Sequence, residues 1–288
     1  MRGLRRAYPS ARIVLATPKP LDPLARFCGA VDKVLPTAGL GDLRWPGPPP
    51  DVAVNLHGRG PESIADLLAT KPKTLISHRN PKYPAVSGPP WRDELHEVDR
   101  WCALLGAAGI VCNPGDLALD RPPGYPRRDD VVVIHPGAAA PSRRWPADRF
   151  AVVAAALADA GHRVVVTGSV AEKSLAETVA AQAGLDQSAV LAGELDVLGM
   201  VALISDSRLL VCGDTGVGHI ATATGTPSVL LFGPVPPSRW GPRGAGRHIA
   251  VWAGDCGDPH GDRPHRGLLL ITVSRVLEAT RQILAECA

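Results

Sequence analysis

The sequence has few aromatic residues, little net charge and no long apolar run. Phe, Trp and Tyr make up 4% of its 288 residues, so an aromatic platform for stacking bases is not expected. The net charge of +3 is too small to favour nucleic acid as a partner. No stretch approaches the ~20 apolar residues of a membrane helix, and the first residues do not form a secretory signal peptide. We therefore expect a cytoplasmic protein with no nucleic-acid partner and at most peripheral membrane contact.

Metal-binding and disulfide motifs are missing as well. The six cysteines are scattered along the chain, and no two form a Cys-x-x-Cys pair. This spacing fits reduced thiols better than a disulfide framework or a zinc site. The sequence therefore predicts no bound metal and no cofactor.

Strands and helices alternate along the chain, which predicts parallel sheets with helices on both faces. The length allows two such domains. Residues 113–130 are polar and rich in proline and glycine, as linkers are. We place the boundary between the domains 1–125 and 126–288. The expected strands lie at 11–17, 31–35, 51–56 and 73–76 in the first domain, and at 131–135, 163–167, 189–191, 209–212 and 228–232 in the second.

The most informative stretch covers residues 209–242 and reads LLVCGDTGVGHIATATGTPSVLLFGPVPPSRWGP. It predicts a buried strand, a glycine-rich turn, a helix over 217–224 and a second strand. Three glycines in the six residues 213–218 allow a sharp turn and the close approach of a ligand. The first amides of the helix and the positive end of its dipole would face that turn, which favours phosphate binding.

Other interpretations of this turn remain open. No Gly-Lys-Ser/Thr follows it, so it is not a Walker loop, and Gly213, Gly216 and Gly218 are wrongly spaced for a dinucleotide fingerprint. Asp214 is also the residue that ordinary helix capping selects. His219 lies one turn into the helix, where it could bind a ligand or simply pack.

Further polar residues follow other strands of the second domain. In open α/β sheets, ligands bind outside the carboxyl ends of the strands. Gly137 and Arg143 follow the first strand there, and Glu172 follows the second. Together with Asp214, Thr215 and Gly216 after the fourth strand, they predict a nucleotide-diphosphate site. Arg143 and the amides of residues 215–218 would bind the phosphates, and Glu172 would accept from ribose hydroxyls.

Three stretches of the second domain carry a family resemblance. Residues 135–151 read HPGAAAPSRRWPADRFA, residues 164–173 read VVVTGSVAEK, and residues 213–242 cover the glycine-rich turn. They resemble glycosyltransferase family 9, the heptosyltransferase-type enzymes. Residues 4–17, 50–58 and 96–106 of the first domain match more weakly.

The resemblance implies a GT-B fold, in which two Rossmann-like, doubly wound domains face a central cleft, with the last helix crossing back to the first domain. It implies metal-independent, inverting transfer of a sugar from a nucleotide-diphosphate donor to a glycan or glycolipid acceptor. The family's diphosphate-facing lysine falls on Arg143 and its ribose-binding glutamate near Glu172. Its Asp-Thr-Gly turn falls on Asp214, Thr215 and Gly216, and its histidine on His219. The glycines Gly137 and Gly218 would complete the donor side.

The first domain departs from the family pattern. The family begins with a strand and a Gly-Asp loop whose aspartate is the proposed catalytic base, whereas Met1 falls inside the helix that follows. We therefore expect the first strand to be missing from the N-terminal sheet, and we assign no catalytic residue. His57 and Arg59 end a strand and are candidates for acceptor contact. The alternatives are a nucleotide-sugar-binding protein with little turnover and a sugar-nucleotide epimerase.

Overall fold

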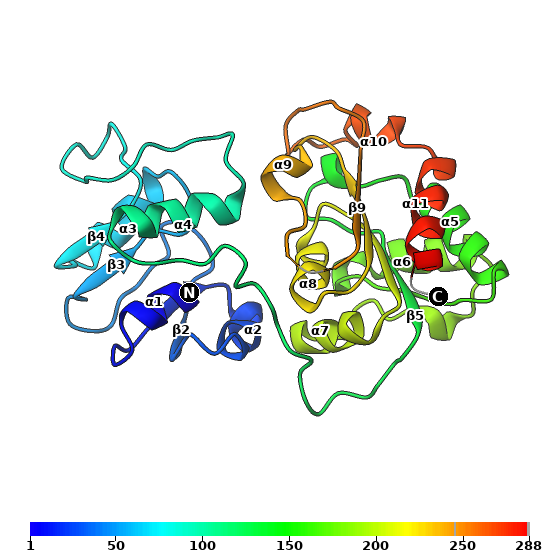
Figure 1. Cartoon of the computed structure of the whole chain (residues 1–288), viewed down its shortest axis with the longest axis horizontal. Coiled ribbons are helices and arrows are strands. Elements are labelled where there is room, and N and C mark those ends of the chain that lie inside the picture. The colour runs from blue at the N-terminus through cyan, green and yellow to red at the C-terminus, as the bar shows by residue number, and fades with distance from the viewer. Residues whose placement is uncertain (245, 287–288) are drawn as a thin grey trace. The chain divides into compact units, whose positions relative to one another are not determined.

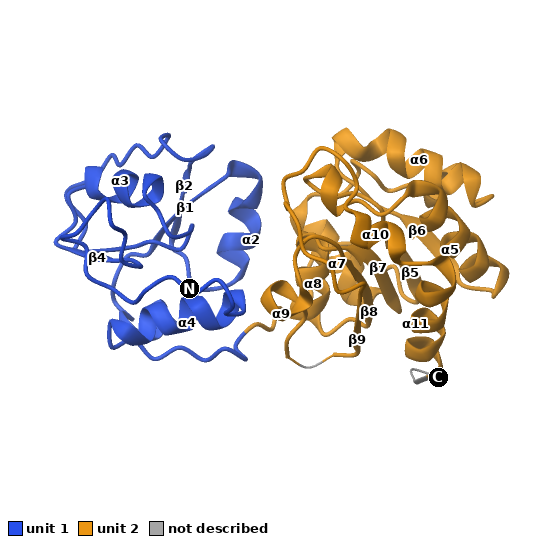
Figure 2. Cartoon of the chain, turned by 90° about the horizontal axis from the view of Figure 1, so that it is seen from above, with its two compact units in different colours: residues 1–116 blue, residues 117–288 orange. Residues whose placement is uncertain are grey.

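The computed structural model describes residues 1–244 and 246–286. Its contacts divide the chain into two compact units, Met1–Asp116 (unit 1) and Leu117–Ala288 (unit 2) (Figure 2). The segment after Asp116 is held to unit 2 by Arg121, which donates to the Asp206 carboxylate at 2.7 and 2.8 Å. The amide of Leu119 also donates to the Ala223 carbonyl of unit 2, at 2.8 Å.

Unit 1 contains four short strands that pair in parallel as two separate sheets, β1 with β2 and β3 with β4. Among the described residues, no ladder joins the two pairs. The strands of unit 1 pair in parallel, as the sequence predicts, but they form two separate pairs. The strands are β1 (Val14–Thr17), β2 (Lys33–Pro36), β3 (Val52–Val54) and β4 (Thr74–Ile76).

The first and last helices of unit 1 share a small apolar core with strand β4. Leu104 and Leu105 pack with Ile110, Ile76 and Leu4. The longest helix begins after His96, whose side chain accepts from the amide of Val98. The helices are α1 (Arg2–Ala7), α2 (Asp22–Phe27), α3 (Glu62–Ala69) and α4 (Glu97–Ala107).

Unit 2 is built on one five-stranded parallel sheet with the order β6-β5-β7-β8-β9 (Figure 1). The three central strands, β5, β7 and β8, are buried along their whole length. Their apolar runs VVVIH, LLVCG and SVLLF suit strands that are covered on both faces. The strands are β5 (Val131–His135), β6 (Arg163–Val166), β7 (Leu209–Gly213), β8 (Ser228–Phe232) and β9 (His248–Trp252).

Helices cover both faces of this sheet, as the alternation of elements predicts. Alternate residues of β5 enter different cores: Val132 and Ile134 pack with one group of helices, and Val131 and Val133 with the other. The first group comprises α5 (Ala147–Asp159), α6 (Lys173–Gln182) and α11 (Val273–Glu286). The second comprises α7 (Val197–Asp206) and α8 (Gly216–Thr224). The last helix, α11, packs within unit 2 against α5, β8 and β9.

Four elements of unit 2 differ from the sequence expectation. The strand expected at 189–191 is a single bridge between Val166 and Val190, after a short turn of 3-10 helix. Strand β9 was not predicted, because this edge strand is only partly buried and lacks a continuous apolar run. The sequence analysis predicts no helix where the short helices α9 (Pro237–Trp240) and α10 (Arg266–Leu270) lie. Five of the six cysteines are free thiols, and Cys287 lies outside the described residues.

Trp145 anchors the start of α5 in the core of unit 2. Its side chain is 2% exposed, its indole nitrogen donates to the Ile271 carbonyl at 3.0 Å, and its ring meets Phe150 edge-on at 5.0 Å. We predict that Trp145→Phe lowers the free energy of unfolding by ~2 kcal/mol, because a cavity replaces part of the indole and the hydrogen bond is lost.

Urea unfolding followed by circular dichroism measures this loss. The matched control is Trp240→Phe, since Trp240 is 37% exposed and should cost well under ~1 kcal/mol. An equal loss in the two variants would contradict the anchoring role of Trp145.

Candidate functional site

The amino end of α8 lies directly after the buried strand β7. Gly213 ends that strand with its backbone against the loop after β5: a Cβ there would lie 2.9 Å from the Arg143 carbonyl oxygen. Gly218 faces β8, where a Cβ would lie 3.1 Å from Leu230. Packing therefore requires glycine at position 213, whereas a Cβ at position 218 would need a small shift of the Leu230 side chain. Gly216 is exposed, with no atom within 4 Å of an added Cβ.

The first turn of α8 offers free backbone donors. Thr215 is the N-cap residue and makes no side-chain capping bond. The amide of Gly218 donates to the Thr215 carbonyl at 3.0 Å. In the described part of the chain, the amides of Gly216 and Val217 donate to no protein acceptor. Such amides, with the positive end of the helix dipole, form an anion-binding site.

Asp214 lies at the start of this helix and feels the charge of Arg143. Asp214 is 8% exposed. Burial raises the pKa of its carboxyl, and the Arg143 charge opposes that rise. The Arg143 Nε is buried without a hydrogen-bond partner among the described residues. Arg143 thus carries an unused donor, and its backbone carbonyl packs against Gly213 at the end of β7.

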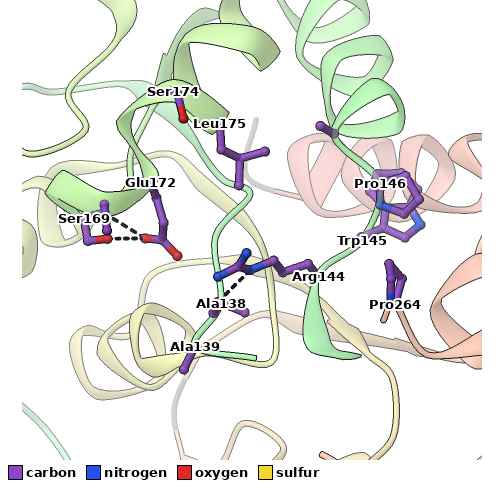
Figure 3. A pocket seen from close by; sticks show the side chains of 12 residues that line it. Ala138, Ala139, Arg144, Trp145, Pro146, Ser169, Glu172, Ser174, Leu175 and Pro264 are labelled. Carbon is purple, nitrogen blue, oxygen red and sulfur yellow. Dashed lines mark hydrogen bonds between the residues drawn. The ribbon is translucent and has the colours of Figure 1, made fainter. Parts of the chain in front are cut away.

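Glu172 follows β6, the edge strand that pairs with β5, and its side chain is held in place there. Its carboxylate accepts from the Ser169 amide at 2.9 Å and from the Ser169 hydroxyl at 2.8 Å (Figure 3). Burial acts to raise the pKa of Glu172, but these hydrogen bonds and the positive charges nearby hold it below its usual value. A Cβ on Gly137 would lie 2.2 Å from the carboxylate. Glycine at position 137 therefore leaves the space that Glu172 occupies.

His135, the last residue of β5, is a buried titratable residue that was not among the predicted site residues. It is 6% exposed, and its Nδ1 shares a hydrogen bond of 2.9 Å with the Thr167 hydroxyl. Burial lowers its pKa to about 4, so the ring is neutral at pH 7. The signal was present in the sequence, because a titratable residue stands at the carboxyl end of a predicted strand just before Pro136 and Gly137.

A cavity of about 550 Å³ opens between the loop after β5 and the start of α6 (Figure 3). Glu172 and Arg144 are its charged walls. The hollow at the α8 end is far narrower, about 10 Å³, and is bordered by Asp214, Thr215 and His219. The larger cavity is lined by Ala138, Ala139, Arg144, Trp145, Pro146, Ala147, Ser169, Ala171, Glu172, Ser174, Leu175 and Pro264.

The remaining predicted site residues are exposed. His219 lies on the outer side of α8, with its ring centroid 6.0 Å from that of Trp240. His57 and Arg59 follow β3 in unit 1 and are exposed. Just before them, the buried Asn55 amide donates to the hydroxyls of Ser63 and Ser77, each at 3.1 Å. The bond to Ser77 joins the carboxyl ends of β3 and β4, and the bond to Ser63 joins β3 to α3. Both bonds lie just before the two exposed residues in the chain.

The described residues contain neither a cluster of metal ligands nor a membrane-spanning helix. No three His, Cys, Asp or Glu side chains gather there in a way that would hold a metal ion. No helix in residues 1–244 or 246–286 combines the length and apolar character needed to cross a bilayer.

Comparison with protein families gives a match over residues 93–258 to the model "Glycosyltransferase family 9 (heptosyltransferase)". Lipopolysaccharide heptosyltransferase 2 of Escherichia coli (strain K12) is 30% identical over 193 residues, covering 63% of this chain and 52% of the relative. Lipopolysaccharide heptosyltransferase 1 of Pseudomonas aeruginosa is 35% identical over 159 residues, covering 52% of this chain and 43% of the relative. The chain thus spans about half the length of the curated relatives that it matches.

Solved structures extend the likeness to the whole chain. The E. coli ADP-heptose lps heptosyltransferase II superposes with a TM-score of 0.71 at 24% identity, covering 99% of this chain and 93% of that one. A glycosyl transferase family 9 protein from Veillonella parvula superposes with a TM-score of 0.80 at 21% identity, covering 99% and 92%. At these identities the likeness establishes the fold, which is the α/β GT-B fold.

The contact between Gly137 and Glu172 gives a stability test. We predict that Gly137→Ala lowers the free energy of unfolding by ~1–3 kcal/mol, because the added Cβ displaces the carboxylate. Gly216→Ala is the matched control, since its Cβ enters open space and alanine favours the helix. Urea unfolding measures both. Adding Glu172→Ala should recover part of the loss in the Gly137→Ala variant, and strictly additive losses would contradict the contact.

The buried His135 gives a pH test. A histidine in the unfolded chain has a pKa of ~6.5, so the unfolded state takes up the proton first as the pH falls. Between pH 7 and pH 5 this residue should therefore lower the free energy of unfolding by ~2 kcal/mol. Urea unfolding of wild type and His135→Gln at both pH values checks this. The variant should lose less stability than wild type, and identical losses would contradict a neutral buried ring.

Proposed function

Since the chain belongs to glycosyltransferase family 9, we propose that it transfers a sugar from a nucleotide-diphosphate donor to a hydroxyl of a glycan or glycolipid acceptor. The proposal rests on the pair of free amides at Gly216 and Val217 and on the buried, unpaired Nε of Arg143, whose backbone carbonyl packs against the end of β7. The names of the relatives, which are lipopolysaccharide heptosyltransferases, support heptose or a related sugar and a cell-envelope acceptor.

We propose that the diphosphate binds at the amino end of α8. Its oxygens would accept from the amides of Gly216 and Val217, and Arg143 would neutralise their charge. A carboxylate next to a phosphate is unfavourable, so Asp214 would not contact the ligand. Its charge would act on Arg143 instead, as the effect of Arg143 on the Asp214 pKa indicates. Thr215, Gly218 and His219 would form the border of this site, and Gly137 would leave room for Glu172.

Glu172 would bind the ribose of the donor. Both of its fixed hydrogen bonds come from Ser169, and its pKa is held low. The carboxylate therefore stays ionised at neutral pH and can accept from vicinal hydroxyls. This role requires the sugar of the nucleotide to enter the cavity of about 550 Å³ beside it.

The proposed reaction is an inverting displacement. The acceptor oxygen attacks the anomeric carbon, the bond from that carbon to the phosphate oxygen breaks, and a nucleoside diphosphate leaves with the bonding electrons. Negative charge grows on the leaving oxygen, where Arg143 and the α8 amides would stabilise it. In this proposal they supply the positive charge without a metal ion. The hydroxyl proton passes to a base that we do not assign.

The acceptor side is proposed for unit 1. His57 and Arg59 are exposed after β3, at the carboxyl end of a parallel strand, which is where ligands of α/β sheets bind. We further propose that the protein acts in the cytoplasm, with at most peripheral contact with a membrane that carries the acceptor.

Calorimetric titration with ADP tests the proposal. We predict that Arg143→Met weakens ADP binding by ~10–100-fold, the effect of one lost charge-assisted hydrogen bond of ~1.5–3 kcal/mol. Arg143→Lys should retain part of the affinity. Arg275→Met on the exposed surface of α11 is the control and should bind as wild type does.

A transfer assay with ADP-heptose and a lipopolysaccharide-core acceptor completes the test. Release of ADP that depends on the acceptor supports transfer. Tight binding of ADP without release would leave only a nucleotide-binding function. Failure of the wild-type chain to bind any nucleoside diphosphate would refute the proposal as a whole.

A further inference from the structure

The adjacent arginines Arg143 and Arg144 serve different sides of the loop after β5. Arg143 ends a turn of 3-10 helix, and Arg144 has an extended backbone with φ −94° and ψ 117°. The charge of Arg143 acts on Asp214, whereas that of Arg144 acts on Glu172. The two guanidinium groups therefore belong to two different surroundings within unit 2.

Arg144 is held in place by its Nε, which donates to the Ala138 carbonyl at 2.8 Å. This bond fixes the plane of the guanidinium and leaves its two terminal nitrogens for other acceptors. Figure 3 shows that the group points into the cavity, toward the side on which Glu172 lies. In the described ranges, no ion pair joins the Arg144 guanidinium to the Glu172 carboxylate. The cavity thus has a cation on one wall and a carboxylate on the other.

This arrangement matches one fragment of the proposed donor. Glu172 accepts from hydroxyls, and a nucleoside phosphate carries its ribose hydroxyls and its first phosphate on opposite sides of one sugar ring. Trp145, Pro146 and Leu175 give the cavity apolar walls, which suit the carbon face of a ring. A volume of about 550 Å³ lies within the ordinary range of small-ligand sites.

Building on the proposed function, we propose that Arg144 binds the phosphate attached to the ribose, while Arg143 and the α8 amides bind the outer phosphate. Each arginine then serves one phosphate of the diphosphate. A nucleoside monophosphate uses Arg144 and Glu172 but reaches neither Arg143 nor the helix end. Arg144 is thus a specificity-determining residue for the nucleotide half of the donor.

The test measures binding of AMP and ADP by calorimetry to wild type, Arg144→Gln and Arg143→Gln. Arg144→Gln should weaken both nucleotides by the same factor, at least tenfold. Arg143→Gln should weaken ADP at least tenfold and change AMP less than threefold. Arg275→Gln is the surface control. The circular dichroism spectrum and melting temperature of each variant verify that it is folded.

Arg144→Lys separates charge from loop anchoring, since lysine keeps the charge but loses the bond from Nε to Ala138. Partial recovery of AMP binding relative to Arg144→Gln supports direct phosphate contact. Equal losses in the two variants would show that Arg144 only fixes the loop, and would overturn the inference. Unchanged AMP and ADP binding in Arg144→Gln, with ADP lost in Arg143→Gln, would also overturn it and leave the proposed function intact. Wild-type protein that binds no nucleotide would refute both.

Discussion

The close contact between the loop after β5 and the end of β7 is the constraint on which the candidate site depends. Gly213 has no side chain because the carbonyl of Arg143 occupies that space. The loop is anchored elsewhere by backbone bonds, from the Ser142 amide to the Gly261 carbonyl at 3.1 Å and from the His265 amide to the Ser142 carbonyl at 3.2 Å. Trp145 closes it against the core. The rigid loop determines where both neighbouring arginines lie.

Electrostatics gives the two sides of this loop different properties. On one side, Asp214 is buried, and burial raises its pKa although the charge of Arg143 opposes the rise. An anion that binds on this side would be attracted by the Arg143 charge and by the free amides of α8. On the other side, Glu172 is held ionised by Ser169 and borders an open cavity. The site therefore combines a strong phosphate attraction with a fixed acceptor for hydroxyl groups.

Much of unit 2 was predictable because its central strands are continuous apolar runs that end at glycines and polar residues. The same pattern indicated the α8 turn, Arg143 and Glu172.

His135 was missed because it looks like the last residue of a buried strand, and its contact with Thr167 joins segments far apart in sequence. The different directions of Arg143 and Arg144 were not predictable, because they depend on local backbone angles. Strand β9 and the short helices α9 and α10 depend on tertiary packing more than on local pattern. In unit 1 the strands have only three or four residues, and the sequence pattern did not show that they form two pairs.

The proposed donor site depends on the free amides of Gly216 and Val217 and the Arg143 guanidinium holding a diphosphate together. A crystal structure of the chain with bound ADP would test this. Phosphate oxygens are expected at ~3 Å from both amides and from the Arg143 side chain, which is hydrogen-bonding distance. A nucleotide bound with its phosphates away from the start of α8, or with Arg143 turned toward solvent, would contradict it.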